Sequence, residues 1–337
     1  MKILLNCHLP FLLAHGGMQI QIEQTKAALE KIGVDVEYLR WWDESQKGDI
    51  LHHFGLFDTA LTKLAHRKNW KVAMTVLLTA QCNRSEREYL VRKIPIRGAL
   101  ALLPQKLKAQ LPWQTYFECD RVIVGLKAER MVLEKVYGVP GEHVSVVPLG
   151  LNDVFLNAGP ASRTDDALIC TGTISPAKNS LELARLAQAA KTPMLFVGKP
   201  FDLKGAYWME FQKLIDGKIV RHHSHVSSAP ELISLLQRAR GYVLMSRAEN
   251  WSLAAHEAAA CGLPVLVPNQ RWAHERFGER AQYWPANGFD ASVAALRRFY
   301  DACPQLSAPG IRQYSWVEVA QILCGVYGQM LQPAPKP

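Results

Sequence analysis

The 337-residue sequence lacks any apolar run that approaches the roughly 18 residues needed to cross a bilayer. The first dozen residues are rich in apolar side chains. However, Asn6, His8 and Pro10 interrupt them and no small-residue cleavage site follows, so a signal peptide is not expected. A buried strand over residues 2–6 explains the stretch better. We therefore expect a cytoplasmic protein rather than a secreted or integral membrane protein.

Cysteine follows no recognisable pattern. The seven cysteines are odd in number, no two have the CxxC spacing, and no group of Cys and His has the spacing of zinc ligands. We therefore expect reduced, mostly buried thiols, with no disulfide framework and no bound metal. The dinucleotide fingerprint GxGxxG is also missing, which disfavours a nicotinamide-dependent enzyme.

Positive charge exceeds negative charge, and the excess is local. The net charge is +9, and residues 81–111 carry seven Lys or Arg against Glu86 and Glu88. Such a patch attracts anionic lipid, nucleic acid or a phosphorylated substrate, or is simply a solvated face. No nucleic-acid motif accompanies it, so nucleic acid is not expected as a partner.

Segment 84–108 also contains apolar residues, as segments that lie at a membrane interface do. We therefore predict that it docks on an anionic membrane surface, which would place the protein peripherally on the inner face of the membrane. Because Pro95, Gly98 and Pro104 break any long helix, we expect a bent element. The apolar residues are Ile94, Ile96, Leu100, Leu102, Leu103 and Leu107.

Short apolar runs alternate with amphipathic stretches along the chain, which is typical of βαβ units and parallel sheets. A turn-rich segment over 150–166 divides two such series of similar length. We therefore predict an α/β protein of two Rossmann-like, doubly wound domains that face each other across a cleft, with ligands at the carboxyl ends of the strands. The expected strands are 2–6, 35–39, 49–54, 71–76, 121–125 and 144–148, then 167–172, 193–198, 218–223, 241–246 and 263–267. The expected helices are 18–33, 57–67, 127–137, 179–190, 207–216, 229–239, 254–261, 290–302 and 313–330.

Two glycine-containing turns fall where a strand leads into a helix. His15-Gly16-Gly17 follows the first strand, and Gly172 to Asn179 follows the strand over 167–172. Glycine lets the backbone approach a ligand closely, and the N–H groups of a helix N-terminus attract anions. Lys178 lies in the second turn, where it can neutralise a phosphate. Tight structural turns and a solvated lysine remain the alternatives.

A third motif, SRAENWSLAAHEAAACGLP over 246–264, places two glutamates eight positions apart. Glu249 follows a predicted strand, and Glu257 lies in a helix of small residues that can pack closely on a sheet. Glutamate is rarely buried without a partner. The pair therefore indicates hydrogen bonding to a polyhydroxylated ligand, with an ordinary surface role for Glu257 as the alternative.

The sequence resembles the retaining glycosyltransferases of group 1, also called family 4, which have the GT-B fold. The resemblance covers almost the whole chain, and its most specific part is the segment over 246–264. It implies an N-terminal acceptor-side domain over 1–150, a nucleotide-sugar-binding domain over 151–312, and a final helix over 313–337 that returns to the first domain. The other segments that carry it are MKILL with HGG, residues 119–155, ALICTGTISPAKN and QYSWVEVA.

The resemblance also implies roles for individual residues. Gly16 and Gly17 would approach the diphosphate of the donor, and Lys178 would pair with it beside Thr173. Glu249 would contact the donor sugar and Glu257 would hold the ribose hydroxyls. The backbone of Asn250, Trp251, Ser252 and Leu253 would line the sugar and phosphate site. These cations and helix N-termini would replace a metal on the leaving diphosphate, so no cofactor is expected beyond a UDP- or GDP-linked donor.

Three positions depart from the family pattern. Thr173 stands where an arginine is usual, so one cation is missing, and Ser252 stands where glycine is usual. The usual histidine after the fourth strand is replaced at Leu77 and Leu78. His52 and His53 are candidate substitutes, with a structural role for both as the equal alternative.

The resemblance implies a hexosyltransferase that acts on a glycan or lipid-linked acceptor in the synthesis of cell-surface polysaccharide or glycolipid. Because of these departures, a catalytically weakened sugar-nucleotide-binding subunit is the alternative. Sugar-nucleotide epimerisation is a third possibility, which the two glutamates disfavour.

Overall fold

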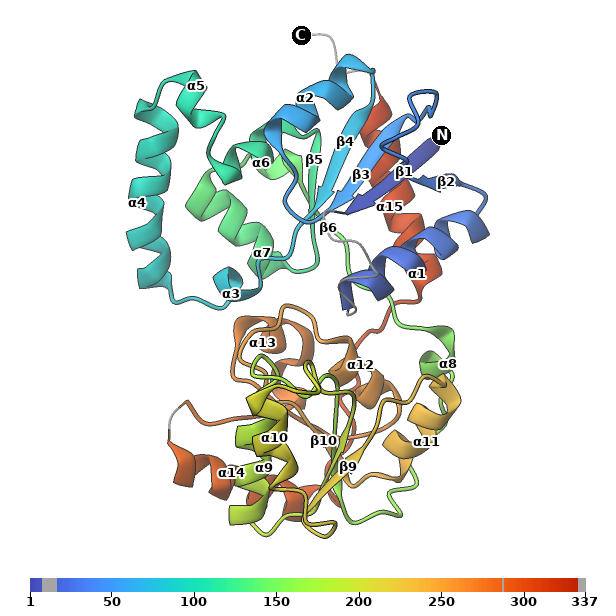
Figure 1. Cartoon of the computed structure of the whole chain (residues 1–337), viewed down its shortest axis with the longest axis vertical. Coiled ribbons are helices and arrows are strands. Elements are labelled where there is room, and N and C mark those ends of the chain that lie inside the picture. Colours follow the sequence, from blue (N-terminus) through green and yellow to red (C-terminus); the bar gives the residue numbers. More distant parts are fainter. Residues whose placement is uncertain (8–16, 287, 333–337) are drawn as a thin grey trace. The chain divides into compact units, whose positions relative to one another are not determined.

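The computed structural model describes residues 1–7, 17–286 and 288–332, apart from the side chain of Ala80. The chain divides into two compact units, one of residues Met1–Gly150 and Tyr314–Pro337 and the other of Leu151–Gln313 (Figure 1). Each unit is an α/β structure around its own parallel sheet, which confirms the predicted fold class. No helix among the described residues is long and apolar enough to span a membrane.

The N-terminal unit contains a six-stranded sheet with the order β2-β1-β3-β4-β5-β6. All five strand pairs are parallel. The strands are β1 (Lys2–Cys7), β2 (Asp35–Tyr38), β3 (Ile50–Phe54), β4 (Lys71–Thr75), β5 (Arg121–Val124) and β6 (Val144–Val146). The helices are α1 (Gly17–Lys31), α2 (Thr59–Arg67), α3 (Thr79–Cys82), α4 (Glu86–Leu102), α5 (Gln105–Lys108), α6 (Thr115–Glu118), α7 (Lys127–Val132) and α15 (Trp316–Leu331), with a π-helical turn over Leu133–Tyr137 and 3₁₀ turns over Pro112–Gln114 and Gly141–His143.

The last helix, α15, is part of the N-terminal unit although 163 residues of the other unit precede it in the chain. It packs beside α1, and apolar side chains of both helices join those of β1 and β3 in one core. Ser315 and Glu318 form a reciprocal capping box that fixes where α15 begins. Trp316 lies so close to Gly150 that a Cβ there would approach its ring to 2.5 Å.

The C-terminal unit contains a second six-stranded sheet with the order β12-β11-β10-β7-β8-β9, again parallel throughout. The strands are β7 (Leu168–Thr171), β8 (Met194–Val197), β9 (Val220–His223), β10 (Gly241–Val243), β11 (Val265–Val267) and β12 (Gln282–Tyr283). The helices are α8 (Asp153–Leu156), α9 (Ser180–Ala189), α10 (Ala206–Gln212), α11 (Ala229–Arg238), α12 (Leu253–Ala260), α13 (Arg271–Phe277) and α14 (Phe289–Ala302), with a 3₁₀ turn over Gly278–Arg280.

The prediction that Pro95 and Gly98 prevent a long helix was wrong. Both lie inside α4, which runs without interruption for 17 residues. A capping box between Ser85 and Glu88 starts the helix. Pro95 cannot donate a hydrogen bond to the carbonyl of Val91, but both residues are exposed, so water can reach that carbonyl. Pro104 does end the element, and the short α5 follows it.

His52 links the sheet of the N-terminal unit to α15. Its Nδ1 lies 2.6 Å from the hydroxyl of Tyr327, and its Nε2 lies 2.7 Å from the hydroxyl of Thr75. Burial, with a smaller contribution from His53, lowers the pKa of His52 to about 3. The imidazole is therefore neutral in the folded chain at any pH above that value.

This depressed pKa predicts acid sensitivity of the N-terminal unit. An unfolded histidine binds a proton below about pH 6.5, whereas folded His52 binds one only near pH 3. Stability is therefore fully present above pH 6.5 and is lost as the pH falls toward 3, with a slope of about 1.4 kcal/mol per pH unit for this one proton. We expect His52→Gln to flatten the acid slope of the unfolding free energy by about that amount, as measured by urea denaturation between pH 4 and 6.5. An unchanged slope would mean that His52 is charged in the folded chain.

Candidate functional site

The candidate site lies at the carboxyl ends of two neighbouring strands in the C-terminal unit. Strand β7 leads into the turn over 172–179 and strand β10 leads into the loop over 244–252, and the two strands are paired side by side. The N–H of Arg247 donates a hydrogen bond to the carbonyl oxygen of Ala177 at 3.0 Å. This contact joins the two loops, so residues about 70 positions apart lie in one place.

Lys178 and Glu249 form an ion pair across these loops. The Glu249 side chain is 11% exposed and the Lys178 side chain is 31% exposed, so the carboxylate lies deeper than the ammonium group. The sequence indicated each residue as part of a ligand site, and the structure brings the two into direct contact. A ligand that binds both side chains must therefore break the ion pair between Lys178 and Glu249.

Glycine is required at the base of the turn that carries Lys178. Gly172 and Gly198 have φ values of 134° and 156°, which side chains rarely tolerate. A Cβ on Gly198 would lie 2.0 Å from the carbonyl oxygen of Gly172. The strand ends of β7 and β8 can therefore approach each other only with glycine at position 198. Thr173, the next residue in the turn, is exposed and adds no charge.

Ser252 begins helix α12 in an unusual conformation. Its φ of 57° lies in the left-handed region, where a non-glycine residue is strained, and its hydroxyl accepts a hydrogen bond from the N–H of Ala255 at 3.4 Å. The glycine that is usual at this position would adopt this conformation freely. Asn250 is partly buried just before the turn, and Leu253 is the first residue of the helix.

A stack of three side chains that sequence reasoning missed supports this loop. The Trp251 ring is buried and stacks on His256, with centroids 5.1 Å apart, while the guanidinium of Arg276 lies 4.1 Å from the Trp251 ring. Arg276 Nε donates to His256 Nε2 at 3.1 Å, and His256 Nδ1 donates to the carbonyl oxygen of Ser252 at 2.9 Å. Burial and then Arg276 lower the pKa of His256 to about 3, so the imidazole is neutral. Only the backbone of Trp251 is left to contact a ligand.

Glu257 lies one residue beyond His256 and differs from Glu249 in its surroundings. None of the described residues makes a hydrogen bond or ion pair to its carboxylate. Burial raises the pKa of Glu257 to about 7. A carboxylate that lacks partners in a desolvated position suits a ligand that brings its own hydrogen-bond donors.

The candidate site residues of the N-terminal unit are Gly16, Gly17, His52 and His53, and none of them is placed in a described ligand site. Gly16 lies outside the described residues, and Gly17 is the exposed first residue of α1, where a Cβ would meet no atom within 4 Å. His52 is committed to the core contacts described above, so its role as a substitute for the missing histidine is wrong. His53 is buried too, with its Nδ1 3.1 Å from the side-chain amide of Asn6.

The segment that replaces the missing histidine is held by a buried carboxylate. Glu129 is fully buried and accepts hydrogen bonds from the N–H groups of Leu78, Gly125 and Leu126 at 2.8, 2.9 and 3.2 Å. Three backbone donors stabilise a buried negative charge. Glu129 therefore fixes the loop after β4 to the turn after β5. Among the described residues, no group of three His, Cys, Asp or Glu is arranged to hold a metal ion.

The raised pKa of Glu257 predicts that this residue destabilises the fold at alkaline pH. The unfolded carboxyl loses its proton near pH 4.5 and the folded one near pH 7, so the folded chain becomes less stable as the pH rises through this window. We expect Glu257→Gln to raise the unfolding free energy by about 1–3 kcal/mol at pH 8.5 and to change it little at pH 4.5. Denaturant titrations at both pH values test this. A loss of stability at pH 8.5 would show that the carboxylate has a partner in the folded chain.

Comparisons with known proteins agree with this arrangement. Residues 157–300 match the family of group 1 glycosyl transferases. A segment covering 44% of the chain is 30% identical over 164 residues to the D-inositol 3-phosphate glycosyltransferase of Arthrobacter sp. (strain FB24), and the match spans only 39% of the length of that relative.

Solved structures extend the likeness to the whole chain. The sucrose-phosphate synthase of Thermosynechococcus elongatus has a TM-score of 0.69 at 16% identity, with 98% of this chain and 99% of that chain covered. The Anabaena protein Alr3699/HepE in complex with UDP and glucose has a TM-score of 0.59 at 12% identity, with 96% and 99% covered. Residues 157–300 therefore resemble the group 1 glycosyltransferases in sequence, and the chain shares the two-sheet GT-B fold of the solved structures.

Proposed function

We propose that the chain is a retaining hexosyltransferase that moves a sugar from a UDP- or GDP-linked donor to a glycan or lipid-linked acceptor. We place it in the synthesis of cell-surface polysaccharide or glycolipid. The observation that carries the proposal is the Lys178–Glu249 ion pair at the joined carboxyl ends of β7 and β10. Two similar proteins agree with this chemistry by name, since one is a glycosyltransferase of an inositol phosphate and the other binds UDP and glucose.

The two residues of the ion pair would contact different parts of a nucleotide-sugar donor. Lys178 is the more exposed partner, and its ammonium group would move away from Glu249 and bind the diphosphate. Negative charge grows on the diphosphate as the glycosidic bond breaks. Glu249 would then accept hydrogen bonds from sugar hydroxyls and favour the positive charge that develops at the anomeric carbon. The diphosphate and the sugar hydroxyls would replace the partners that Lys178 and Glu249 lose, so that neither group would be left without hydrogen bonds.

The remaining groups complete the donor site. The free N–H groups at the start of α12, after Ser252, would add to the stabilisation of the phosphates, so that the reaction would need no metal. Glu257 would accept hydrogen bonds from the ribose hydroxyls and so gain the partners that it lacks in the free protein. The rigid stack of Trp251, His256 and Arg276 would hold the loop between them in place.

A second candidate function is that of a catalytically weakened subunit that binds the sugar nucleotide. The observation that favours it is Thr173, an exposed neutral side chain where relatives of this kind usually carry an arginine. With one cation fewer, the leaving diphosphate would be less stabilised, while binding through Glu257 and the α12 N-terminus would persist. The two functions differ in turnover and not in nucleotide affinity.

The central test measures release of UDP or GDP from a panel of nucleotide sugars, with the anomeric configuration of the product followed by NMR. We expect one donor to be turned over. Glu249→Gln should lower its turnover by about 10–100-fold, equivalent to about 1.4–2.8 kcal/mol, with little change in nucleotide affinity, because the charge acts mainly in the transition state. The exposed Glu231→Gln in α11 is the matched control and should retain activity.

Each alternative has its own result in this experiment. Nucleotide binding without release from any donor would favour the weakened subunit. Sugar transfer that survives Glu249→Ala would place the chemistry elsewhere, and an inverted product would exclude the retaining mechanism.

We also propose that α4 and α5 dock on an anionic membrane on its inner, cytoplasmic face. Leu90, Val91 and Ile94 are between 63% and 74% exposed on α4, and Leu102 at its end is 85% exposed. Exposed basic side chains accompany them, namely Arg87, Arg92, Arg97 and Lys106. An interfacial helix needs both features, since apolar side chains enter the headgroup boundary while cations bind anionic lipid.

Vesicle flotation tests the membrane surface. We expect the protein to float with vesicles of phosphatidylglycerol at low salt, and to float less at high salt because screening weakens the attraction. Ile94→Glu should reduce flotation at least several-fold, whereas Ile20→Glu, at an exposed position of α1, should not. Equal failure to bind anionic and neutral vesicles at low salt would remove this proposal.

A further inference from the structure

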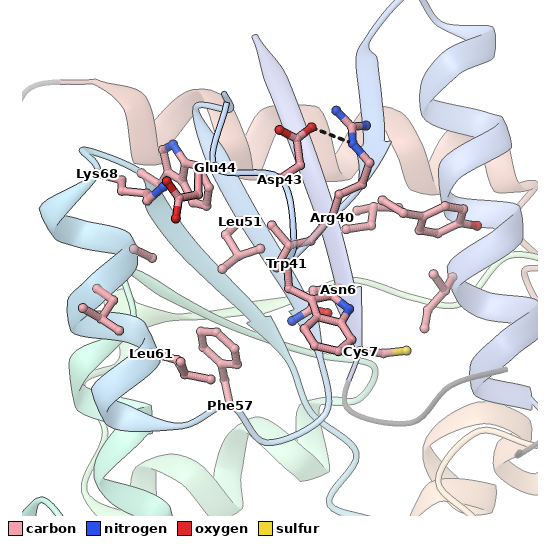
Figure 2. A pocket seen from close by; sticks show the side chains of 17 residues that line it. Asn6, Cys7, Arg40, Trp41, Asp43, Glu44, Leu51, Phe57, Leu61 and Lys68 are labelled. Atoms are coloured by element: carbon pink, nitrogen blue, oxygen red, sulfur yellow. Dashed lines mark hydrogen bonds and ion pairs between the residues drawn. The ribbon is translucent and has the colours of Figure 1, made fainter. Parts of the chain in front are cut away.

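A cavity in the N-terminal unit lies apart from all the site residues above. Its volume is about 790 Å³, and it is formed between α2 and the loop that follows β2, over strands β1 and β3 (Figure 2). This volume lies within the range of small-molecule sites, roughly 300–1,000 Å³. The lining residues are Leu5, Asn6, Cys7, Ile22, Tyr38, Leu39, Arg40, Trp41, Asp43, Glu44, Leu51, Phe57, Leu61, Leu64, Ala65, Lys68 and Trp70.

Leu5, Cys7 and Ile22 of the lining belong to the α1 side of the sheet, and the sheet topology explains why the other side is open. Side chains of β1 and β3 that point to one face, such as Ile3 and Ile50, join the core with α1 and α15. Leu51 alternates with Ile50 and therefore points to the opposite face. On that face α2 connects β3 to β4, so β1 and the edge strand β2 are left to the loop over 39–46. A loop fills space less completely than a helix, and a cavity remains.

The polar groups of the wall are already partnered and balance in charge. Arg40 Nε donates to Asp43 Oδ2 at 3.1 Å, and the Asn6 amide lies 3.1 Å from His53 Nδ1. Lys68 lies over the Trp70 ring, with its Nζ 5.5 Å from the centroid, and Glu44 offsets its charge. The four charged side chains of the lining sum to zero. The cavity therefore does not select for an anion or a cation, and binding energy must come from apolar contact.

The lining of the cavity follows the strands from one end to the other. Phe57 lies just beyond the carboxyl end of β3, and Trp70 lies just before the start of β4, so the lining extends along the full length of these strands. Five residues of strand span roughly 16 Å at about 3.3 Å each. At the mouth, Trp41 is 85% exposed and Leu61 and Leu64 are about half exposed. An extended apolar chain can therefore contact the lining along the whole length of these strands.

We propose that this cavity binds one alkyl or isoprenoid chain of a neutral amphiphile, with the polar end of the molecule at the mouth beside Trp41 and Leu64. The proposal goes beyond sugar transfer, because no lining residue belongs to the donor site and the binding is independent of turnover. It also differs from the α4 surface, which is basic and attracts anionic headgroups.

Tryptophan fluorescence gives a direct measurement, because Trp41 and Trp70 line the cavity. The probe is 11-bromoundecan-1-ol, whose bromine quenches nearby tryptophan. We expect saturable quenching, and competition by 1-alkanols whose affinity rises about fourfold per methylene, or about 15-fold from octanol to decanol. Trp70→Phe should reduce the amplitude of quenching without changing the affinity for decanol.

A pair of variants separates the cavity from nonspecific binding. Leu64→Lys places an unbalanced charge at the mouth and should weaken binding at least tenfold, and it should fold because Leu64 is 51% exposed. Ile20→Lys makes the same change at a 47% exposed position of α1 outside the lining and should bind as the wild type does.

Several outcomes would overturn the proposal. Quenching that does not saturate, or that is equal in both lysine variants, would indicate surface partitioning. Tighter binding of 2-naphthol than of decanol would make this a site for aromatic rings.

Discussion

The ion pair between Lys178 and Glu249 is the contact on which the candidate site depends. It joins two loops that belong to neighbouring strands, and it keeps a nearly buried carboxylate beside a cation. Removal of Lys178 would take the described counter-ion from a nearly buried carboxylate, which is costly. Without Glu249, nothing described would hold the Lys178 ammonium at the sheet edge. The free protein thus keeps together two charges that a donor would use separately.

The surroundings of the pair are rigid, and this rigidity has a structural cost. Ser252 adopts a left-handed conformation, Gly198 packs against the backbone of Gly172, and burial holds His256 neutral. Each of these features stores free energy that the rest of the fold must supply. Fixed geometry is useful at a site that stabilises developing charge, because groups already in place need no reorganisation during the reaction.

Much of the fold was predictable from the sequence, and the errors have physical causes. Alternation of apolar runs and amphipathic stretches indicated both parallel sheets, because buried strands and packed helices require those patterns. The two residues of β12 and the seven of α13 were missed, since they are too short to show a period. The continuous helix α4 was not predicted, because Pro95 and Gly98 were expected to break it. Helix propensity ignores solvent, which can satisfy the carbonyl that proline leaves without a donor.

The candidate site was also predictable from the sequence only in part. Spacing and residue type singled out Lys178, Glu249 and Glu257, because charged residues near strand ends rarely serve packing. Spacing could not show that Lys178 and Glu249 touch, since they are 71 positions apart in the chain. Nor could it show Arg276 over Trp251, which needs the position of α13. His256 offered a weak signal, as a polar residue within a helix otherwise rich in alanine.

Glu257 is unfavourable for the stability of the folded chain, and the same property favours ligand binding. In the free protein its carboxylate is desolvated and lacks a described partner, so the folded chain stores part of the free energy that binding would release. A ligand with two adjacent hydroxyl groups would supply donors to a carboxylate that water solvates poorly, and the gain would exceed that of the same contact at an exposed residue. Glu249 is different, because its charge is already balanced by Lys178 and a ligand must compete for it. On the proposed function, the two glutamates would contact different parts of one donor: Glu257 the part that only binds, and Glu249 the part that reacts.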